Sequence, residues 1–310
     1  MSRFPNLFLI GAPKAGTTFL HAQFSKSSDI FCALNKEPFY FIRQSIEYLL
    51  HGPDRKKYPL LPEARDKNSY LALYKNWANE TYAIDASTFY LSAPGSAQSI
   101  SETCPDARII AILREPVSRA YSHYLMGLRD GWFKEDLEFV IEHELEEIKT
   151  PEEPWGGHYR QIRNSLYLNG LKDYYERFGA DKMRVYLFED IVKKPEEVLA
   201  DVSKFLNIEP LTLIKADEDR NSYAVDRLPI ITRMINKYRA SPVRSLVNAL
   251  TPRKARDLVR KRYDKTRLKS QGKPTLTAKE RQLLEDHLGN DYTESIAFAR
   301  ENGLLFEKQD

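Results

Sequence analysis

The fold is decided by the stretch Phe8-Leu9-Ile10-Gly11-Ala12-Pro13-Lys14-Ala15-Gly16-Thr17-Thr18-Phe19-Leu20. Apolar residues run into a turn bounded by Gly11 and Gly16, and small hydroxyl residues and a new amphipathic stretch follow. This is the layout of a β-strand, a phosphate-binding loop and an α-helix. The sequence therefore predicts an anion site close to the start of the chain.

The lysine of this loop stands in an unusual place. In the common loop G-x-x-x-x-G-K-[ST], a lysine follows the second glycine and the next hydroxyl holds Mg²⁺. Here Thr17 takes the lysine's position and Lys14 lies between the two glycines. The amides of residues 15–18 can still bind an anion at the positive end of the following helix. The loop suits a 5′-phosphate with an attached acidic group and need not hold a metal; a glycine turn without a ligand is the alternative.

A second anion site is predicted in the middle of the chain. Residues 107–113 read as a buried strand, and Arg114 follows directly, at the strand end where open parallel sheets bind ligands. Pro116 begins the next helix, and Ser122 lies about two turns into it on the inward-facing side. An arginine fork with a hydroxyl suits a terminal phosphate. The alternative is that Arg114 caps the sheet edge or pairs with Glu115.

Together these segments resemble the sulfotransferase superfamily that uses 3′-phosphoadenosine 5′-phosphosulfate (PAPS). Residues 13–18 resemble its 5′-phosphosulfate loop and residues 114–124 its 3′-phosphate motif. The Arg-Glu-Pro form resembles the carbohydrate and heparan-type enzymes and their bacterial relatives. Weaker matches are Lys36-Glu37-Pro38 and residues 84–91, 164–178 and 185–190.

The resemblance implies a role for each residue of the two motifs. Lys14 would donate to the oxygen that bridges to the departing 5′-phosphate. The 5′-phosphate side would be held by Lys14, Ala15, Gly16, Thr17 and Thr18, and the 3′-phosphate by Arg114 and Ser122. Tyr167 would lie on the nucleotide side, or would be an aromatic that packs its helix.

The acceptor must lose a proton, and the resemblance places a catalytic glutamate at Glu37. Glu37 is therefore the expected general base, with a surface ion pair as the plain alternative. His123 is the second candidate base. Asp85 could orient Lys14 or contact the acceptor. Aromatic residues 39–41, 89–90 and 132–133 could stack on sugar rings, cover a lipid-like tail or belong to the core.

The expected fold class is α/β, a P-loop-like three-layer fold with a central, mostly parallel sheet flanked by helices. Strands are predicted at residues 6–10, 29–33, 81–85, 107–113 and 183–188. Helices are predicted at 16–26, 67–78, 95–103, 116–129, 134–149, 160–178, 195–206, 228–239 and 276–300. The chain is read as one domain, 1–310, with a nucleotide-binding core at 1–210 and a basic helical extension at 211–310.

The amino-acid composition limits the class of protein that the chain can be. With 42% hydrophobic and 29% charged residues, the 310-residue chain is typical of a globular protein. Its two cysteines do not indicate a disulfide framework, and no apolar run reaches the roughly 18 residues that span a bilayer. If Met1 is the natural start, a cytoplasmic location is expected.

Positive charge is concentrated in residues 227–273, which contain fifteen Lys and Arg but only two Asp. This segment suits an anionic partner, or is a solvated helical hairpin.

The expected function is sulfuryl transfer from PAPS to a hydroxyl, or second to an amine, of a carbohydrate or glycolipid-like acceptor. PAP, the desulfated nucleotide, is the product, and no metal is required. No nucleic-acid partner is expected, and the acceptor's identity and the oligomeric state are not determined by the sequence. A P-loop kinase or phosphotransferase that uses Mg-ATP is the alternative enzyme, and a polyanion-binding module is the alternative without catalysis.

Overall fold

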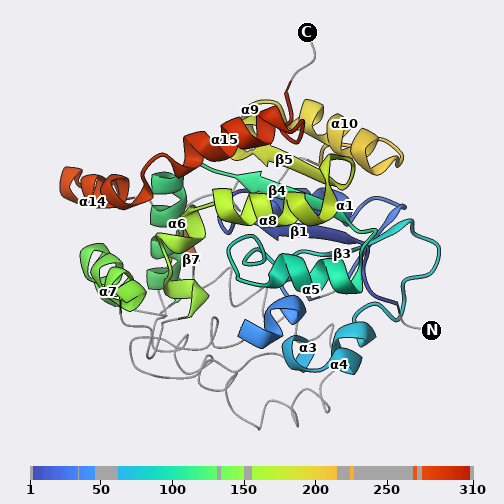
Figure 1. The fold of residues 1–310 in the computed structure, drawn as a ribbon, viewed down its shortest axis with the longest axis horizontal. Coiled ribbons are helices and arrows are strands. Elements are labelled where there is room, and N and C mark those ends of the chain that lie inside the picture. Colours follow the sequence, from blue (N-terminus) through green and yellow to red (C-terminus); the bar gives the residue numbers. More distant parts are fainter. Residues whose placement is uncertain are drawn as a thin grey trace.

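A computed structural model describes residues 3–33, 35–45, 62–130, 134–149, 156–214, 224–226, 268–270 and 274–307. Its centre is a five-stranded sheet made of β1 (Leu7–Gly11), β2 (Ile30–Cys32), β3 (Tyr82–Asp85), β4 (Arg108–Leu113) and β5 (Met183–Leu187). The strands lie in the order β2-β3-β1-β4-β5, and every neighbouring pair is parallel (Figure 1). The predicted α/β class and all five predicted strands are confirmed.

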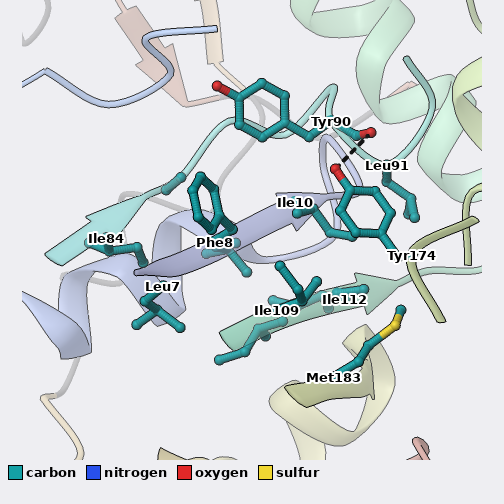
Figure 2. Close-up of a cluster of buried hydrophobic side chains, with 14 of the residues drawn as sticks. Leu7, Phe8, Ile10, Ile84, Tyr90, Leu91, Ile109, Ile112, Tyr174 and Met183 are labelled. Atoms are coloured by element: carbon teal, nitrogen blue, oxygen red, sulfur yellow. Dashed lines mark hydrogen bonds between the residues drawn. The ribbon is translucent and has the colours of Figure 1, made fainter. Parts of the chain in front are cut away.

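The core surrounds β1. Leu7, Phe8, Leu9 and Ile10 are all 0% exposed, which fits a continuous apolar run in a parallel sheet covered on both faces. Side chains of β1, β4 and β5 pack together there with Tyr90 and Tyr174 (Figure 2). Each fully buried large apolar side chain stabilises the fold by about 1.5–3 kcal/mol.

Helices cover both faces of the sheet. The longer ones around it are α1 (Thr17–Phe24), α5 (Ser96–Thr103), α6 (Pro116–Asp130), α8 (Leu168–Phe178) and α10 (Pro195–Leu206). The connection through α1 runs from β1 towards β2, whereas the connection through α5 runs from β3 the other way, to β4. Since crossovers between parallel strands are right-handed, these two helices lie on opposite faces. The predicted flanking layers are therefore present.

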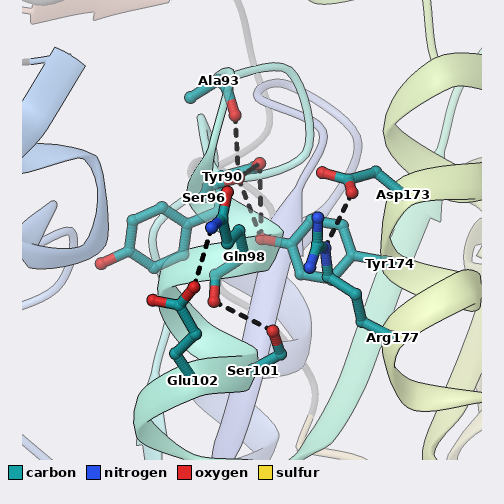
Figure 3. A network of polar contacts seen from close by, with 9 residues as sticks. All are labelled: Tyr90, Ala93, Ser96, Gln98, Ser101, Glu102, Asp173, Tyr174 and Arg177. Carbon is teal, nitrogen blue, oxygen red and sulfur yellow. Dashed lines mark hydrogen bonds and ion pairs between the residues drawn. The ribbon is translucent and has the colours of Figure 1, made fainter.

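Helices α5 and α8 are joined by buried polar contacts (Figure 3). The hydroxyl of Tyr174 donates to Ser96 Oγ at 3.2 Å and to the carbonyl of Tyr90 at 3.4 Å. Ser96 in turn donates to the same Tyr90 carbonyl at 2.5 Å. These contacts fix the backbone of Tyr90 between the two helices.

The strand order creates a natural binding edge. Strand β1 lies beside β4, yet the chain leaves β1 towards β2 and leaves β4 towards β5. Ligands of open α/β sheets bind where neighbouring connections diverge in this way, outside the carboxyl ends of the strands. Lys14 follows β1 and Arg114 follows β4, so the fold brings both predicted anion sites to this point.

The prediction of a single helix over residues 160–178 was wrong in its first part. The chain there forms 3-10 turns at Gly157–Tyr159 and Arg163–Ser165, and α8 begins only at Leu168. The carboxylate of Glu144, on α7 (Leu137–Lys149), accepts the amides of Gln161, Ile162 and Arg163 at 2.6–2.8 Å. These bonds replace the ones that a helix would make.

Other boundaries also differ from prediction. Residues 276–300 form two helices, α14 (Ala278–Leu288) and α15 (Asp291–Glu301), separated at Gly289, where φ is +53°. The helix predicted at 67–78 is α4 (Lys67–Ala72), preceded by the short α3 (Pro62–Arg65). Phe188 starts α9 (Phe188–Lys193) instead of ending a strand. The helix predicted at 228–239 lies outside the described residues.

The last described residues return to the sheet. Helix α15 packs against α8, and the amide of Val185 in β5 donates to the Leu304 carbonyl at 2.9 Å. Phe306 donates back to Val185 at 2.9 Å, which adds a parallel bridge at the sheet's edge. Most of the basic segment 227–273 lies outside the described residues; from it, β7 (Leu268–Ser270) pairs antiparallel with β6 (Ala224–Asp226). No helix in the described part of the chain is both long and apolar enough to cross a membrane.

Candidate active site

The loop between β1 and α1 needs both of its glycines. Gly11 has φ +148°, and a Cβ there would lie 2.6 Å from the carbonyl oxygen of Thr88. Gly16 has φ +93°, and a Cβ there would lie 3.1 Å from a ring carbon of Phe188. Any other residue would therefore force the loop away from its neighbours or strain its backbone.

The first turn of α1 points its amides at this loop. The amide of Ala15 donates to the Ala12 carbonyl at 3.2 Å, so it belongs to the loop's own turn. Gly16 is the N-cap and no side chain caps the helix. The amides of a first turn have no partner within the helix. Among the predicted amides, those at Gly16, Thr17 and Thr18 are therefore the ones placed to bind an anion.

Lys14 lies at the rim of this first turn. Its backbone is left-handed, with φ +68°, and its ammonium contacts the Met126 sulfur of α6 at 3.6 Å. Burial, together with the charge of Arg129, lowers the pKa of Lys14 to about 8, while the charge of Asp130 opposes this shift. A thioether is a weak acceptor, so most of the donor capacity of the ammonium remains for an anionic ligand.

Arg114 is next to the Lys14 loop, as the strand order requires. Its Nη1 donates to the carbonyl of Lys14 at 2.7 Å, and its guanidinium lies 4.4 Å from the ring centroid of Phe188. The hydroxyl of Tyr167, a buried residue, donates to the Arg114 carbonyl at 2.8 Å. The structure therefore joins Lys14, Arg114 and Tyr167 in one cluster, with Tyr167 against the backbone of Arg114.

Two more of the predicted site residues, Ser122 and His123, lie on helix α6. Ser122 is partly buried on it, and none of the hydrogen bonds given for the described residues joins it to Arg114. His123 is 0% exposed, and its Nδ1 lies 3.4 Å from Nη1 of Arg119. Burial holds the pKa of His123 well below its ordinary value, and the charge of Arg119 lowers it further. His123 is thus a neutral, enclosed imidazole.

Glu37 lies on the opposite side of the loop, on the segment that follows β2. Its carboxylate accepts a hydrogen bond from Thr88 Oγ1 at 3.3 Å. Burial raises the pKa of Glu37, while Lys36, Thr88 and Lys14 lower it. The charges of Lys14 and Glu37 also shift each other's pKa in the directions that favour the charged forms.

Lys36 is a site residue to which the sequence analysis gave no role. Its Nζ donates to Thr18 Oγ1 at 3.2 Å and to Thr17 Oγ1 at 3.4 Å. A second ammonium therefore stands at the first turn of α1. The sequence did contain a sign of this role, because Lys36 lies beside the predicted base Glu37 in the Lys-Glu-Pro segment.

Of the aromatic residues near the site, most belong to the core. Tyr40, Phe41, Phe89 and Tyr90 are at most 5% exposed. Phe39 is partly exposed, and its ring stacks on Phe89 with 5.6 Å between the centroids. The rings at 40–41 and 89–90 are therefore not placed to stack on a sugar, whereas Phe39 is partly exposed, and residues 132–133 lie outside the described residues.

A distant residue also supports the cluster at Arg114. The carboxylate of Asp291, on α15, accepts the amides of Tyr167 at 2.5 Å and Leu168 at 3.2 Å, and so caps α8, which has no side-chain cap at Tyr167. Sequence reasoning missed this contact because the partners lie more than a hundred positions apart and no local pattern links them.

Replacing Asp291 with alanine is expected to destabilise the protein by about 1–2 kcal/mol, because two amides at the start of α8 lose their acceptor. Urea unfolding measures this change. Asp173→Ala is the matched control, because Asp173, among the residues that the structure describes, forms a surface pair with Arg177 on the same helix, worth about 0.3–0.5 kcal/mol. Equal stability losses in the two variants would contradict the capping role of Asp291.

Comparison with known proteins identifies the family. Residues 5–212 match the model of the sulfotransferase family. A solved sulfotransferase from Alicyclobacillus acidocaldarius is 30% identical, with a TM-score of 0.58 over 70% of this chain and 87% of that one.

Two curated relatives are more distant. The membrane-associated sulfotransferase kil1 of Dictyostelium discoideum is 29% identical over 147 residues, 46% of this chain and 28% of that protein. Carbohydrate sulfotransferase 15 of Mus musculus is 22% identical over 249 residues, 67% of this chain and 44% of that protein. This chain therefore matches less than half the length of either protein. The family match covers the phosphate loop, Arg114 and Glu37 in one stretch, and the chain belongs to the sulfotransferase family.

Proposed function

We propose that this protein transfers a sulfuryl group from PAPS to an acceptor hydroxyl at the carboxyl edge of β1 and β4. The observation that carries the proposal is the contact between the two anion sites, in which Arg114 donates to the carbonyl of Lys14 at 2.7 Å. Two cationic groups from neighbouring strands thus stand beside one helix N-terminus. This arrangement suits a ligand with two separate phosphate groups.

The residues present fit the donor PAPS. The amides of Gly16, Thr17 and Thr18, at a helix start without a side-chain cap, would hold the 5′-phosphate. Lys36 would add positive charge through the two threonine hydroxyls that it contacts. Arg114 would bind the 3′-phosphate, with Ser122 as a second donor. PAPS, when bound, is the source of the sulfuryl group.

Lys14 and Glu37 divide the chemistry between them. The Lys14 ammonium would stabilise the negative charge that grows on the bridging oxygen of the departing 5′-phosphate. Glu37 would accept the proton of the acceptor hydroxyl, for which burial tunes its pKa upward from the ordinary value. Glu37 is favoured over His123 because the imidazole is fully enclosed and its pKa is strongly lowered.

The acceptor we favour is a carbohydrate or a glycolipid-like molecule. The support is the name of one relative, carbohydrate sulfotransferase 15. Phe39 offers a partly exposed ring two residues from the proposed base, and such a ring can pack against the apolar face of a sugar. An amine is the second candidate acceptor. Its support is the name of another relative, a bifunctional heparan sulfate N-deacetylase/N-sulfotransferase from Caenorhabditis briggsae that is 23% identical over 223 residues.

A transfer assay with ³⁵S-labelled PAPS tests the proposed function. The enzyme is incubated with glycans, phenols, steroids and hydroxylated lipids in turn, with and without EDTA. Labelled product that forms equally in EDTA is expected. Transfer of phosphate from ATP that depends strictly on Mg²⁺, without sulfate transfer, would overturn the proposal in favour of a P-loop kinase.

The pH dependence of kcat/KM for PAPS is expected to be bell-shaped, since it reports ionisations of the free enzyme. As pH falls through the pKa of Glu37, above its ordinary 4.5, the protonated carboxyl can no longer accept a proton. As pH rises through the pKa of Lys14, about 8, the ammonium loses its charge. Activity therefore falls on both sides.

The basic side of this profile has its own control. In Lys14→Arg the residual activity is expected to lose the fall near pH 8, because a guanidinium keeps its proton to a pKa above about 12. A fall that stays near pH 8 in this variant would show that another group causes it.

A further inference from the structure

A buried carboxylate at the end of β3 lies at the centre of a hydrogen-bond network beside the proposed base. Asp85 is 1% exposed, and its Oδ2 accepts the hydroxyls of Tyr70 at 2.7 Å and Tyr90 at 3.0 Å. Its Oδ1 accepts the hydroxyl of Ser87 at 2.7 Å. Three donors thus converge on one side chain. A carboxylate can accept from all of them, whereas an amide has only one accepting oxygen.

The network reaches the segment that carries Glu37. Ser87 Oγ, held by Asp85, accepts the amide of Phe39 at 3.2 Å. The Tyr90 hydroxyl, also held by Asp85, accepts the amide of Phe41 at 3.2 Å. Both hydroxyls donate to the carboxylate and accept from the backbone, so the charge of Asp85 sets the direction of both hydrogen bonds.

Two further contacts tie the same two segments together at Glu37 itself. The amide of Glu37 donates to the carbonyl of Ala86 at 3.2 Å, and Thr88 Oγ1 donates to the Glu37 carboxylate at 3.3 Å. The backbone of Tyr90 is anchored from behind by Ser96 and Tyr174 (Figure 3). Residues 85–90 are therefore a fixed support against which the Glu37 segment lies.

The supported segment has an unfavourable backbone. Glu37 has φ +60° and Phe39 has φ +57°, and neither is glycine. Each left-handed non-glycine residue costs about 1–3 kcal/mol and persists only where its surroundings impose it. The amides of residues 37, 39 and 41 donate hydrogen bonds to oxygen atoms of residues 86–90, and these contacts hold the strained backbone in place here.

The prediction that Asp85 orients Lys14 has no hydrogen bond to support it within the described part of the chain. The hydrogen bonds given for its carboxylate reach Tyr70, Ser87 and Tyr90, and Lys14 is not among these partners. Its burial has an energetic cost that raises its pKa to about 6. The charge of Glu37 contributes to this rise, while the hydrogen bonds from Ser87, Tyr70 and Tyr90 oppose it.

We propose that Asp85 is a positioning residue for sulfuryl transfer, which orients Ser87 and Tyr90 so that they hold the Glu37 segment in its strained conformation. The proposal rests on the proposed function, in which Glu37 is the base. Asp85 itself touches neither donor nor acceptor in this scheme and acts only through the placement of Glu37.

The test compares Asp85→Asn, Glu37→Gln and the double variant in the ³⁵S transfer assay, with the best acceptor from the screen. Asp85→Asn is expected to lower kcat by roughly 10²-fold, as misplacement of a catalytic group does. The Kd of PAP, measured by calorimetry, is expected to stay within about twofold, since Lys14 and Arg114 are untouched. In the Glu37→Gln background, Asp85→Asn is expected to cause no further loss of kcat, because there is no base left to position.

Each other result has a distinct meaning. Normal kcat in Asp85→Asn, with kcat lost in Glu37→Gln, overturns the positioning role and leaves the proposed function standing. Losses of kcat that multiply in the double variant show that Asp85 acts independently of Glu37, and also overturn it. Unchanged kcat in Glu37→Gln refutes the base assignment, and the positioning role falls with it.

A second variant, Tyr90→Phe, tests the same proposal if Asp85→Asn does not fold. It removes the hydroxyl that links Asp85 to Phe41, and it is expected to lower kcat while the PAP affinity is kept. Tyr186→Phe is the matched control, because the hydroxyl of the buried Tyr186 donates at 2.8 Å to the carboxylate of the partly buried Asp201, away from Glu37. Equal kcat values for Tyr90→Phe and Tyr186→Phe would overturn the proposal.

Discussion

Replacing Lys14 with alanine is expected to lower kcat by about 10²–10³-fold, the usual effect of removing one preorganised group that stabilises transition-state charge. The affinity for PAP is expected to fall less than kcat, because the amides at 16–18, Lys36 and Arg114 remain. The reason for the difference is that the ammonium contributes most where charge grows, on the oxygen of the leaving phosphate. Steady-state transfer kinetics and calorimetry with PAP measure the two quantities on the same preparation.

Lys26→Ala is the control for the loss of one positive charge. Lys26 is exposed just beyond the end of α1 and is expected to be replaceable without effect on kcat. Turnover that survives in Lys14→Ala would remove the basis for the leaving-group role. A loss of PAP affinity with kcat unchanged at saturating PAPS would mean that Lys14 only binds the nucleotide.

Replacing Glu37 with glutamine is expected to lower kcat by about 10²–10⁴-fold, the usual contribution of a general base. Glutamine keeps the shape and can still accept from Thr88, but it cannot take a proton from the acceptor. The affinity for PAP is expected to stay near normal. Single-turnover measurements with enzyme in excess over labelled PAPS separate the chemical step from product release.

Glu102→Gln is the control for this isosteric change, because Glu102 is exposed on α5 and its carboxylate pairs only with Gln98 among the contacts given for the described residues. If Glu37→Gln retains its kcat, Glu37 is not the base and His123 becomes the candidate. Loss of turnover on replacement of His123 would then show that His123 is the base.

The parts of the site that lie at strand ends were predictable from the sequence. Residues 8–20 and 107–114 each combine a buried strand with a charged or glycine-bounded end, which is a local pattern. The neighbouring positions of β1 and β4 then follow from the parallel α/β arrangement. The contact between Arg114 and the Lys14 carbonyl is the three-dimensional result of these two local patterns.

The parts that were missed depend on contacts between distant positions. The helix predicted at 160–178 fails in its first part because the Glu144 carboxylate takes three of its amides, and the Arg119 guanidinium takes the Gln161 carbonyl at 2.7 Å. Neither partner is near in sequence. The capping of α8 by Asp291 and the contacts that link Asp85 to the Glu37 segment could not be predicted from the sequence for the same reason.

The break between α14 and α15 is a different kind of error. Gly289 followed by Asn290 is a local signal for the end of a helix, and Gly289 does adopt a positive φ there. The prediction of one continuous helix over residues 276–300 did not take this signal into account. The Gly-Asn pair was therefore readable from the sequence.

A crystal structure of the protein soaked with PAP tests the central claim most directly. The 5′-phosphate is expected at the amides of Gly16, Thr17 and Thr18 with the Lys14 ammonium beside it, and the 3′-phosphate at Arg114. Electron density for the nucleotide at any other place, or calorimetry that detects no heat of binding with PAP, would contradict the claim.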